Sequence, residues 1–385
     1  MIPYGRQQIS QADIDAVVAV LQSDFLTQGP AAQRFEQAVA EKCGAKHAVS
    51  LNSATSALHI ACLALGLGGG DMLWTVPNTF VASANCGRYC GADIDFVDID
   101  PESWDLSVPA LQAKLMRAKR NGKLPKVVVP VHFGGQPTEQ EAIWELAREF
   151  GFKVIEDASH SIGATRNSET VGSGRWSDIT VFSFHPVKII TTAEGGLALT
   201  NDDELAWRMG IFRTHGITRD AERLQQKPDG PWYYEQLELG YNYRMNDLQA
   251  TLGLSQLNRL EEFVQKRNAL AATYDNLLSG LPLRTQKIRA GNRSAFHLYP
   301  IRLKLDAIGK THRAVFEAMR AADIGVNLHY MPVHLQPYYK ALGFAPGLCP
   351  QSEQYAGEAI TLPLYPELTE QQQNRVVQAL RTALS

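Results

Sequence analysis

The stretch FKVIEDASHS, residues 152–161, decides the fold of this chain. Its first half is a short apolar run of the length of one strand, and its second half supplies acidic and polar side chains where that strand would end. A similar run at 126–132 contains three consecutive valines, which are apolar on both alternating sets of positions. Strands of this kind are covered on both faces, as in parallel sheets. The stretch therefore predicts a buried parallel strand that ends in polar groups.

The same pattern repeats on both sides of this stretch, from about residue 45 to residue 200. Helix-patterned segments, such as 107–120 and 138–150, lie between the apolar runs. An alternation of strands and helices predicts an α/β fold with a mainly parallel sheet flanked by helices. We expect its strands at residues 47–51, 72–76, 94–99, 126–132, 152–156, 178–184 and 196–200.

Beyond about residue 245 the pattern changes to a long helix at 245–278, followed by a smaller α+β segment. The chain has 385 residues, more than twice the common domain size of about 150 residues, so two domains are expected. We predict a large α/β domain at 11–250 and a small α+β domain at 251–385, with residues 1–10 packing near the active site. In the small domain we expect strands at 295–303 and 325–330 and helices at 310–322 and 369–384.

Two local predictions concern the ends of the large domain. Ser10 is expected to cap an N-terminal helix in which Ile14, Val17, Val18 and Leu21 form the buried stripe. The polar loop at 221–230, which contains proline and glycine, is expected to be exposed.

Composition limits the classes of partner. The chain carries 37 Lys and Arg against 40 Asp and Glu, a net charge of −3, so it has no basic field for nucleic acid or an anionic membrane. No apolar run approaches the ~20 residues of a membrane span, and the first residues lack the layout of a secretion signal. The five cysteines show no CxxC spacing, so we expect free thiols in a cytoplasmic protein.

Two polar clusters follow predicted strands, where open α/β sheets bind ligands. The first, NSATSALH at 52–59, opens a helix, and its free amides and small hydroxyls would suit a phosphate or serve as a simple helix cap. The second contains Asp157 and His160. Asp157 would either hold a protonated heterocycle nitrogen or cap the next helix, and His160 would be a ligand contact or a structural histidine.

The third cluster, FSFHPVK at 182–188, is the most specific of the three. Burial penalises the charged form of a lysine, and a neutral amine is the nucleophile that condenses with an aldehyde. The alternative for Lys188 is a solvated loop charge. Pyridoxal 5′-phosphate (PLP) requires such a lysine, an anion opposite its pyridine nitrogen, a phosphate cup and a wall against its ring. We expect these from Lys188, Asp157, the helix start at Ala54 and Thr55 with Ser183, and Phe80, in that order.

With these residues in view, the chain resembles the sugar-nucleotide aminotransferases of the DegT/DnrJ/EryC1/StrS group, within the type I aspartate aminotransferase-like fold. The resemblance runs nearly end to end and implies a PLP-dependent transaminase. Its landmarks are LTQG at 26–29, NSATSALH at 52–59, EDASH at 156–160, SFHPVK at 183–188, RTHG at 213–216 and GYNYRM at 240–245.

The resemblance implies a role for each matching residue. Lys188 and Asp157 would be catalytic, with Lys188 linked to the cofactor and Asp157 facing its pyridine nitrogen. His160 would lie near the ring substituents, and Asn242 would reach the phosphate bound in a neighbouring subunit, which implies a homodimer with shared active sites. The remaining cofactor contacts would be Ala54, Thr55 and Ser183 at the phosphate and Phe80 against the ring.

A narrower resemblance rests on TTAEGG at 191–196 and HYMPVHLQPYY at 329–339. These stretches are similar to the transaminases of pseudaminic acid synthesis, which transfer an amino group from L-glutamate to C4 of a UDP-linked 2-acetamido-2,6-dideoxy-hexos-4-ulose. The implied substrate contacts are Tyr4, Asp24, Phe25, Leu26, Thr27, Ala54, Ser183, Asn242, Leu328, His329, Tyr330 and Met331.

Several alternatives remain open. The nearest is a C4 or C3 aminotransferase acting on a different nucleotide-linked keto-hexose. A 3-dehydratase of this scaffold replaces the lysine with histidine, whereas Lys188 is present here. A non-catalytic cofactor-binding regulator is a further class. A metal site built from His132, His160, His185 and His329 fits no known ligand spacing, so no metal is predicted.

Overall fold

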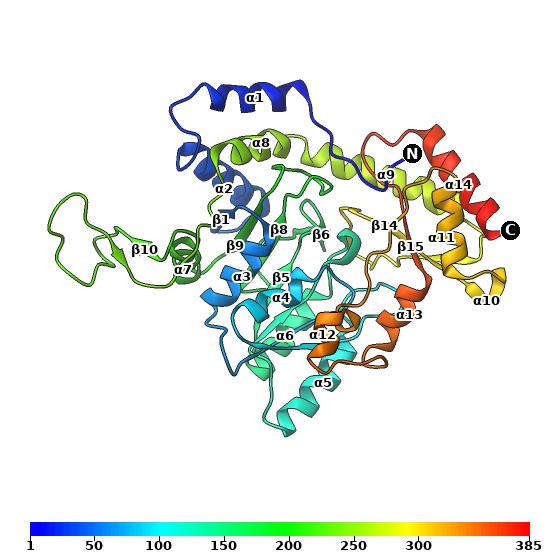
Figure 1. The fold of residues 1–385 in the computed structure, drawn as a ribbon, viewed down its shortest axis with the longest axis horizontal. Helices are drawn as coiled ribbons and strands as arrows, with labels where there is room; N and C mark the ends of the chain where they lie inside the picture. The colour runs from blue at the N-terminus through cyan, green and yellow to red at the C-terminus, as the bar shows by residue number, and fades with distance from the viewer.

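A computed structural model describes residues 1–385 and is built around one large sheet (Figure 1). The sheet has seven strands in the order β1-β9-β8-β5-β4-β2-β3. The four neighbouring pairs from β8 to β3 are parallel, and only β9 runs antiparallel to its neighbours β8 and β1. This confirms the predicted α/β class. The strands are β1 (His47–Leu51), β2 (Met72–Thr75), β3 (Asp93–Phe96), β4 (Val127–Val129), β5 (Lys153–Asp157), β8 (Ile179–Ser183) and β9 (Gly196–Thr200).

All seven strands lie where the sequence predicts them, but several are shorter than expected. The clearest case is β4, which ends at Val129 although we predicted a strand to residue 132. Pro130 follows and has no N–H to donate to the sheet, so regular pairing stops there. Beyond Pro130, one isolated parallel bridge between Val131 and Asp157 continues the pairing with β5.

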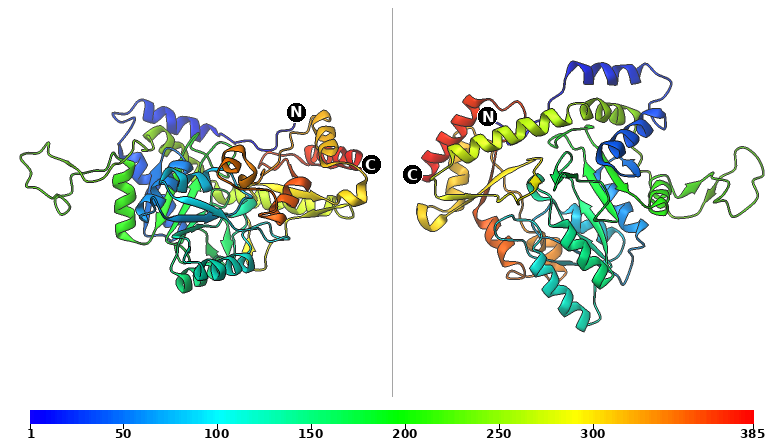
Figure 2. Two further views of the ribbon diagram at one scale, coloured as in Figure 1. Left: turned by 60° about the horizontal axis from the view of Figure 1, so that its bottom comes forward. Right: turned by 180° about the vertical axis from the view of Figure 1, so that it is seen from behind.

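Both faces of the sheet are covered, as the run of three valines predicts. Val127 and Val129 pack into one buried cluster, whereas Val128 between them packs into another. Figure 2 shows helices on both sides of the sheet. The helices of the large part of the chain are α2 (Pro30–Cys43), α3 (Ala54–Ala64), α4 (Ala82–Tyr89), α5 (Val108–Arg120), α6 (Gln140–Phe150) and α7 (Asp203–Arg213).

The prediction of a single long helix at 245–278 is wrong, because this segment forms two helices, α8 (Asp247–Leu257) and α9 (Leu260–Leu277). The break contains Arg259, whose guanidinium donates to the carboxylate of Asp13 and to the carbonyl of Gln8. These partners lie some 250 positions away in the sequence, so local periodicity does not reveal the break.

The small part of the chain contains an antiparallel sheet of β12 (Leu283–Thr285), β14 (Tyr299–Leu303) and β15 (Ala359–Leu362). The prediction of strand from residue 295 is wrong, because regular strand begins only at Tyr299. The predicted strand at 325–330 is also wrong. That segment makes a single bridge, Asn327 with Thr361, and then lines a cavity instead of extending the sheet.

The helices of the small part agree better with the sequence. α11 (His312–Ala321) and α14 (Glu370–Leu384) match the two expected helices, and Thr369 caps the second one. The division into two domains near residue 250 stays a prediction. The other elements are α10 (Leu305–Ile308), α12 (Pro337–Ala341), α13 (Pro350–Glu358), and the short strands β6 (Thr165–Arg166), β7 (Glu169–Thr170), β10 (Ile217–Thr218), β11 (Glu235–Gln236) and β13 (Asn292–Arg293).

The N-terminal helix α1 (Gln11–Leu21) begins as predicted but is buried differently. Ser10 and Asp13 form a reciprocal capping box. The expected buried stripe is wrong, because Ile14, Val18 and Leu21 are all exposed in this chain. The side chain that anchors the helix is instead polar. Asp13 is fully buried, and its carboxylate accepts hydrogen bonds from Ser255, Gln256 and Arg259 of the segment beneath α1 in Figure 1.

Three further observations concern the outer surface and the thiols. The predicted exposed loop at 221–230 lies in the segment that links β10 to β11, which extends far from the body of the protein (Figures 1 and 2). No helix has both the length and the apolar character needed to span a bilayer. All five cysteines are free thiols, as predicted.

We expect Asp13→Ala to lower the free energy of unfolding by about 3 kcal/mol, because it leaves the Arg259 guanidinium without its buried carboxylate partner. Denaturant unfolding measures the change. Asp15→Ala, on the exposed side of the same helix, is the matched control and should change the free energy by less than about 0.5 kcal/mol. Equal effects of the two substitutions would show that the buried carboxylate does not anchor α1.

Candidate active site

A cavity of about 540 Å³ opens at the carboxyl ends of the parallel strands, where open α/β sheets bind ligands. Its volume is in the range of small-molecule sites, about 300–1,000 Å³. Residues that follow β2, β4, β5 and β8 line it, together with the start of α3. Tyr4 from the N-terminus and residues 327–330 from the small part of the chain complete its wall.

Lys188 lines this cavity, five residues after the end of β8. Burial lowers the pKa of its amine to about 8, and the negative charge of Asp157 opposes that shift only in part. The reason is that an ammonium loses its hydration among protein atoms, which favours the neutral form. A substantial fraction of Lys188 is therefore a neutral, nucleophilic amine near physiological pH.

Asp157, the last residue of β5, is buried and faces the same cavity. The hydroxyl of Ser83 donates to its Oδ2 at 2.6 Å, and the backbone N–H of Ser159 donates to its Oδ1 at 3.1 Å. These two bonds fix the orientation of the carboxylate. No Lys, Arg or His side chain forms an ion pair with it, so a buried carboxylate faces the cavity without a cationic partner.

His160 is also buried beside the cavity, and one of its two ring nitrogens has no partner. Its Nε2 lies 3.2 Å from the hydroxyl of Tyr330, whereas Nδ1 is buried without a hydrogen bond. Burial lowers the pKa of His160 well below its usual range, and the nearby charge of Lys188 adds to that shift. His160 is therefore a neutral imidazole with a free ring nitrogen.

At the start of α3, the stretch NSATSALH provides a helix cap and also residues that face the cavity, where a phosphate could bind. Ser53 caps the helix by accepting from the backbone N–H of Ser56 at 3.1 Å. The next two residues, Ala54 and Thr55, line the cavity with Ser183. A Cβ at Gly196 would lie 2.4 Å from the backbone nitrogen of Ala54, so glycine is required for β9 to approach this helix start. Free amides beside hydroxyls form an anion site.

The residues present fit PLP. Lys188 supplies an amine, Asp157 a carboxylate that lacks a cation, His160 an unpartnered nitrogen, and the start of α3 with Ser183 an anion site. Phe80, which is 59% exposed, lies at the rim of the same cavity. These positions agree with the arrangement expected from the sequence, and the individual roles remain proposals.

The structure divides the expected substrate residues into two groups. Ala54, Ser183, Tyr4, Leu328, His329 and Tyr330 line the cavity. The ring of Tyr4 packs against His329 at 5.3 Å between centroids. The other expected contacts lie outside the cavity of their own chain; they are Asp24, Phe25, Leu26, Thr27, Asn242 and Met331.

Sequence reasoning missed two polar residues of the site. Ser83 lies on α4 and reaches Asp157 across 74 positions of sequence, and His297 lines the cavity from the segment before β14. Neither residue belongs to a polar motif at the end of a predicted strand, so the sequence pattern does not mark them. No three or more His, Cys, Asp or Glu side chains gather in a way that could hold a metal ion.

Comparison with known proteins gives consistent results. Residues 7–381 match the model of the DegT/DnrJ/EryC1/StrS aminotransferase family. A UDP-4-amino-4,6-dideoxy-N-acetyl-beta-L-altrosamine transaminase of Campylobacter jejuni is 38% identical over 89% of this chain and 87% of that protein. The spore coat polysaccharide biosynthesis protein SpsC of Bacillus subtilis is 36% identical over 99% of this chain and 96% of that protein.

Solved structures agree over the full length. PseC of Helicobacter pylori, an aminotransferase of pseudaminic acid biosynthesis, has a TM-score of 0.89 at 30% identity and covers 100% of this chain and 99% of its own. The PLP form of the sugar aminotransferase Spr1654 of Streptococcus pneumoniae has a TM-score of 0.89 at 27% identity, covering 100% of this chain and 98% of its own. The fold is the type I PLP aminotransferase fold.

The lowered pKa of Lys188 predicts how the apoprotein captures PLP. Because only the neutral amine condenses with an aldehyde, the capture rate should rise with pH, reach half its maximum near pH 8 and level off above about pH 9. Stopped-flow absorbance at constant ionic strength measures the rate. A midpoint near the ordinary lysine value of about 10.4 would contradict the burial described here.

Ser83→Ala should weaken PLP binding and shift the absorbance of the bound cofactor, because Asp157 loses the 2.6 Å hydrogen bond that orients it. Equilibrium dialysis and visible spectra measure both effects. Ser107→Ala, which removes only the cap of α5, is the control and should lower stability by about 1 kcal/mol without changing the spectrum. An unchanged spectrum in Ser83→Ala would remove Ser83 from the site.

Proposed function

The chain belongs to the DegT/DnrJ/EryC1/StrS aminotransferase family, and from that premise we propose the substrates on which its cavity acts. It is a PLP-dependent sugar aminotransferase. Our proposal is transfer of the amino group of L-glutamate to C4 of a UDP-linked 2-acetamido-2,6-dideoxy-hexos-4-ulose, giving UDP-4-amino-4,6-dideoxy-N-acetyl-β-L-altrosamine for pseudaminic acid biosynthesis. The observation that carries the reaction type is the amine of Lys188, with its pKa lowered to about 8, in the same cavity as the carboxylate of Asp157.

When bound, PLP supplies an aldehyde that exchanges amines and an electron-withdrawing ring that acidifies the carbon attached to the amine. Lys188 would hold the cofactor through its amine. Asp157 would keep a proton on the ring nitrogen, because its carboxylate favours a cation at that position. His160 would offer its free Nδ1 to a ring substituent.

Lys188 is suited to move the proton that transamination requires. With a pKa of about 8, its Nζ accepts a proton as a neutral amine and gives it back as an ammonium at nearly equal free energy near neutral pH. Tyr4, His329 and Tyr330 form part of the wall of the cavity. The same wall would orient the sugar.

The finer substrate assignment has direct support from relatives. The Campylobacter jejuni protein carries the name of this transaminase, and the Helicobacter pylori structure belongs to the same pathway. The cavity residues His329 and Tyr330 are part of the stretch on which the narrower resemblance rests. The hydroxyl of Thr361 lies 2.9 Å from Nδ1 of His329, which fixes that ring at the wall.

The second candidate is a C4 or C3 aminotransferase for a different nucleotide-linked keto-hexose. It is favoured by SpsC, a relative of similar identity whose name refers to spore coat polysaccharide. Incubating the purified protein with glutamate and a panel of keto-sugar nucleotides, followed by mass and NMR identification of the product, separates the two. Amination of the 2-acetamido-4-ulose alone supports the first candidate, and amination of another ketose alone supports the second.

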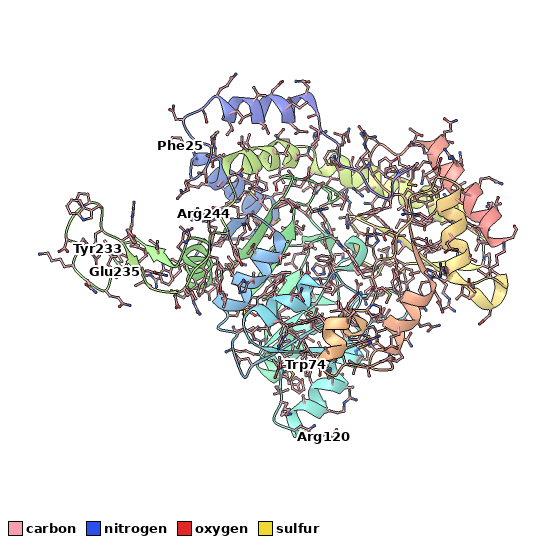
Figure 3. All side chains as sticks on the ribbon, in the orientation of Figure 1. Phe25, Trp74, Arg120, Tyr233, Glu235 and Arg244 are labelled. Carbon is pink, nitrogen blue, oxygen red and sulfur yellow. The ribbon has the colours of Figure 1, made fainter.

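We also propose a homodimer with shared active sites. Asn242 lies outside the cavity of its own chain, where its backbone bridges to Thr214, so it is free to serve a partner's phosphate site. Ile14, Val18 and Phe25 have exposed apolar side chains, which a second copy of the chain would cover. The segment that carries Tyr233 and Glu235 extends away from the body, where it would be able to contact another subunit (Figure 3).

Lys188→Ala should abolish turnover and the absorbance of the covalently held cofactor while the protein remains folded, because no other amine lies at that position of the cavity. Visible spectra, circular dichroism and a coupled 2-oxoglutarate assay measure the three properties. Lys153→Ala, a surface lysine paired with Asp178, is the control and should keep full activity. Retained turnover in Lys188→Ala would defeat the proposed function.

Mixed dimers of Lys188→Ala and Asn242→Ala chains should regain part of the activity. In half of the sites of such a heterodimer, an intact Lys188 meets an intact Asn242 from the other chain. Mixing the inactive homodimers under exchange conditions and measuring glutamate-dependent turnover tests this. If activity stays at the level of the separate variants, each site is completed within one chain.

A further inference from the structure

His297 is a cavity residue that no motif of the sequence marks. It lies between β13 and β14, is only 5% exposed, and lines the cavity that contains Lys188. Its ring makes no hydrogen bond in the structure, and its Nδ1 is buried without a partner. Most buried polar atoms in proteins have a partner, so an unpartnered imidazole at an active site needs an explanation.

The backbone holds His297 in place, which leaves its ring free. The carbonyl of His297 accepts a hydrogen bond from the buried guanidinium of Arg267 at 3.3 Å. On the other side, Gly135 has a φ of +108°, and a Cβ there would lie 3.0 Å from the backbone nitrogen of His297 and 3.0 Å from the carbonyl oxygen of His160. Glycine at 135 therefore lets the backbones of both histidines approach the same point.

The rings of His297 and His160 lie directly against each other. Their centroids are 4.4 Å apart and their planes are tilted by 44°. His160 also faces Tyr330, whose hydroxyl lies 3.2 Å from its Nε2. If that hydroxyl donates, Nε2 accepts and Nδ1 of His160 carries the proton. His160 then presents one N–H donor, and His297 covers the ring that carries it.

We propose that His297 is a positioning residue that shields His160 from water and keeps it a neutral N–H donor toward the cofactor. Two imidazolium ions 4.4 Å apart in a buried site would repel each other strongly, so at most one ring can be charged. A charged His160 would also place a second cation beside Lys188 and offset the carboxylate of Asp157. This inference rests on the cofactor contact proposed for His160.

The groups around His160 and His297 that shift the pKa of these two histidines all lower it. Burial lowers the pKa of both histidines well below the usual range, and the charge of Lys188 adds to the effect on each. The groups that face the pair from the surrounding elements are Lys188, His132, His329, Tyr330 and Arg267. The nearby carboxylate, Asp157, lines the same cavity but is not among the groups that shift the pKa of either histidine.

Titration of His160 in the PLP-loaded enzyme tests the proposal. In wild type, NMR of ¹³C-labelled histidine should show no titration of His160 in the range where ordinary histidines titrate, with the signal assigned by its loss in His160→Gln. His297→Ala admits water beside the ring of His160, so the pKa of His160 should rise toward the ordinary value of about 6.5. The pH profile of kcat/KM should then show an additional ionisation near that pH. His297→Asn should give the same result and serves if the alanine variant does not fold.

His297→Phe places a ring that cannot titrate against His160 and should leave His160 untitrated, as in wild type. His47→Ala, at a distant ion pair with Asp203, is the control for loss of a histidine. An untitrated His160 in both small variants overturns the proposal, as does titration of His160 in His297→Phe. These signals do not depend on which sugar is aminated, so failure of the substrate proposal would be distinguishable.

Discussion

The active site depends on the opposition of two groups, the partly buried amine of Lys188 and the buried carboxylate of Asp157. They stand at the ends of adjacent parallel strands, β8 and β5, and face one cavity. The carboxylate favours a positive charge on the amine, whereas burial disfavours it. Burial is the larger effect, and the pKa of Lys188 falls to about 8. The result is an amine that can both attack an aldehyde and carry a proton, next to a carboxylate that still lacks a cation.

The rest of the structure keeps this pair in position. Ser83 on α4 and the backbone of Ser159 orient Asp157, and Tyr330, delivered by the small part of the chain, orients His160. Gly196 lets β9 approach the start of α3, so the anion site lies beside the strand ends. Segments distant in sequence therefore contribute to one site, and the site depends on the packing of both parts of the chain.

Much of the fold could be predicted from the sequence, because buried parallel strands are continuous apolar runs and polar residues follow them at one edge. This reasoning located Lys188, Asp157 and the start of α3. It failed where distant contacts decide the structure. Asp13, not the apolar stripe of α1, anchors the N-terminal helix, and residues 325–330 line the cavity instead of forming a strand. Ser83 and His297 were missed because no local pattern links them to the site.

Borohydride reduction of the PLP-loaded protein, followed by peptide mass mapping, tests the central claim most directly. Reduction makes an amine–aldehyde link permanent, so the cofactor mass should appear on one peptide, the one that contains Lys188. The cofactor mass on a peptide with a different lysine, or on none, would contradict the account.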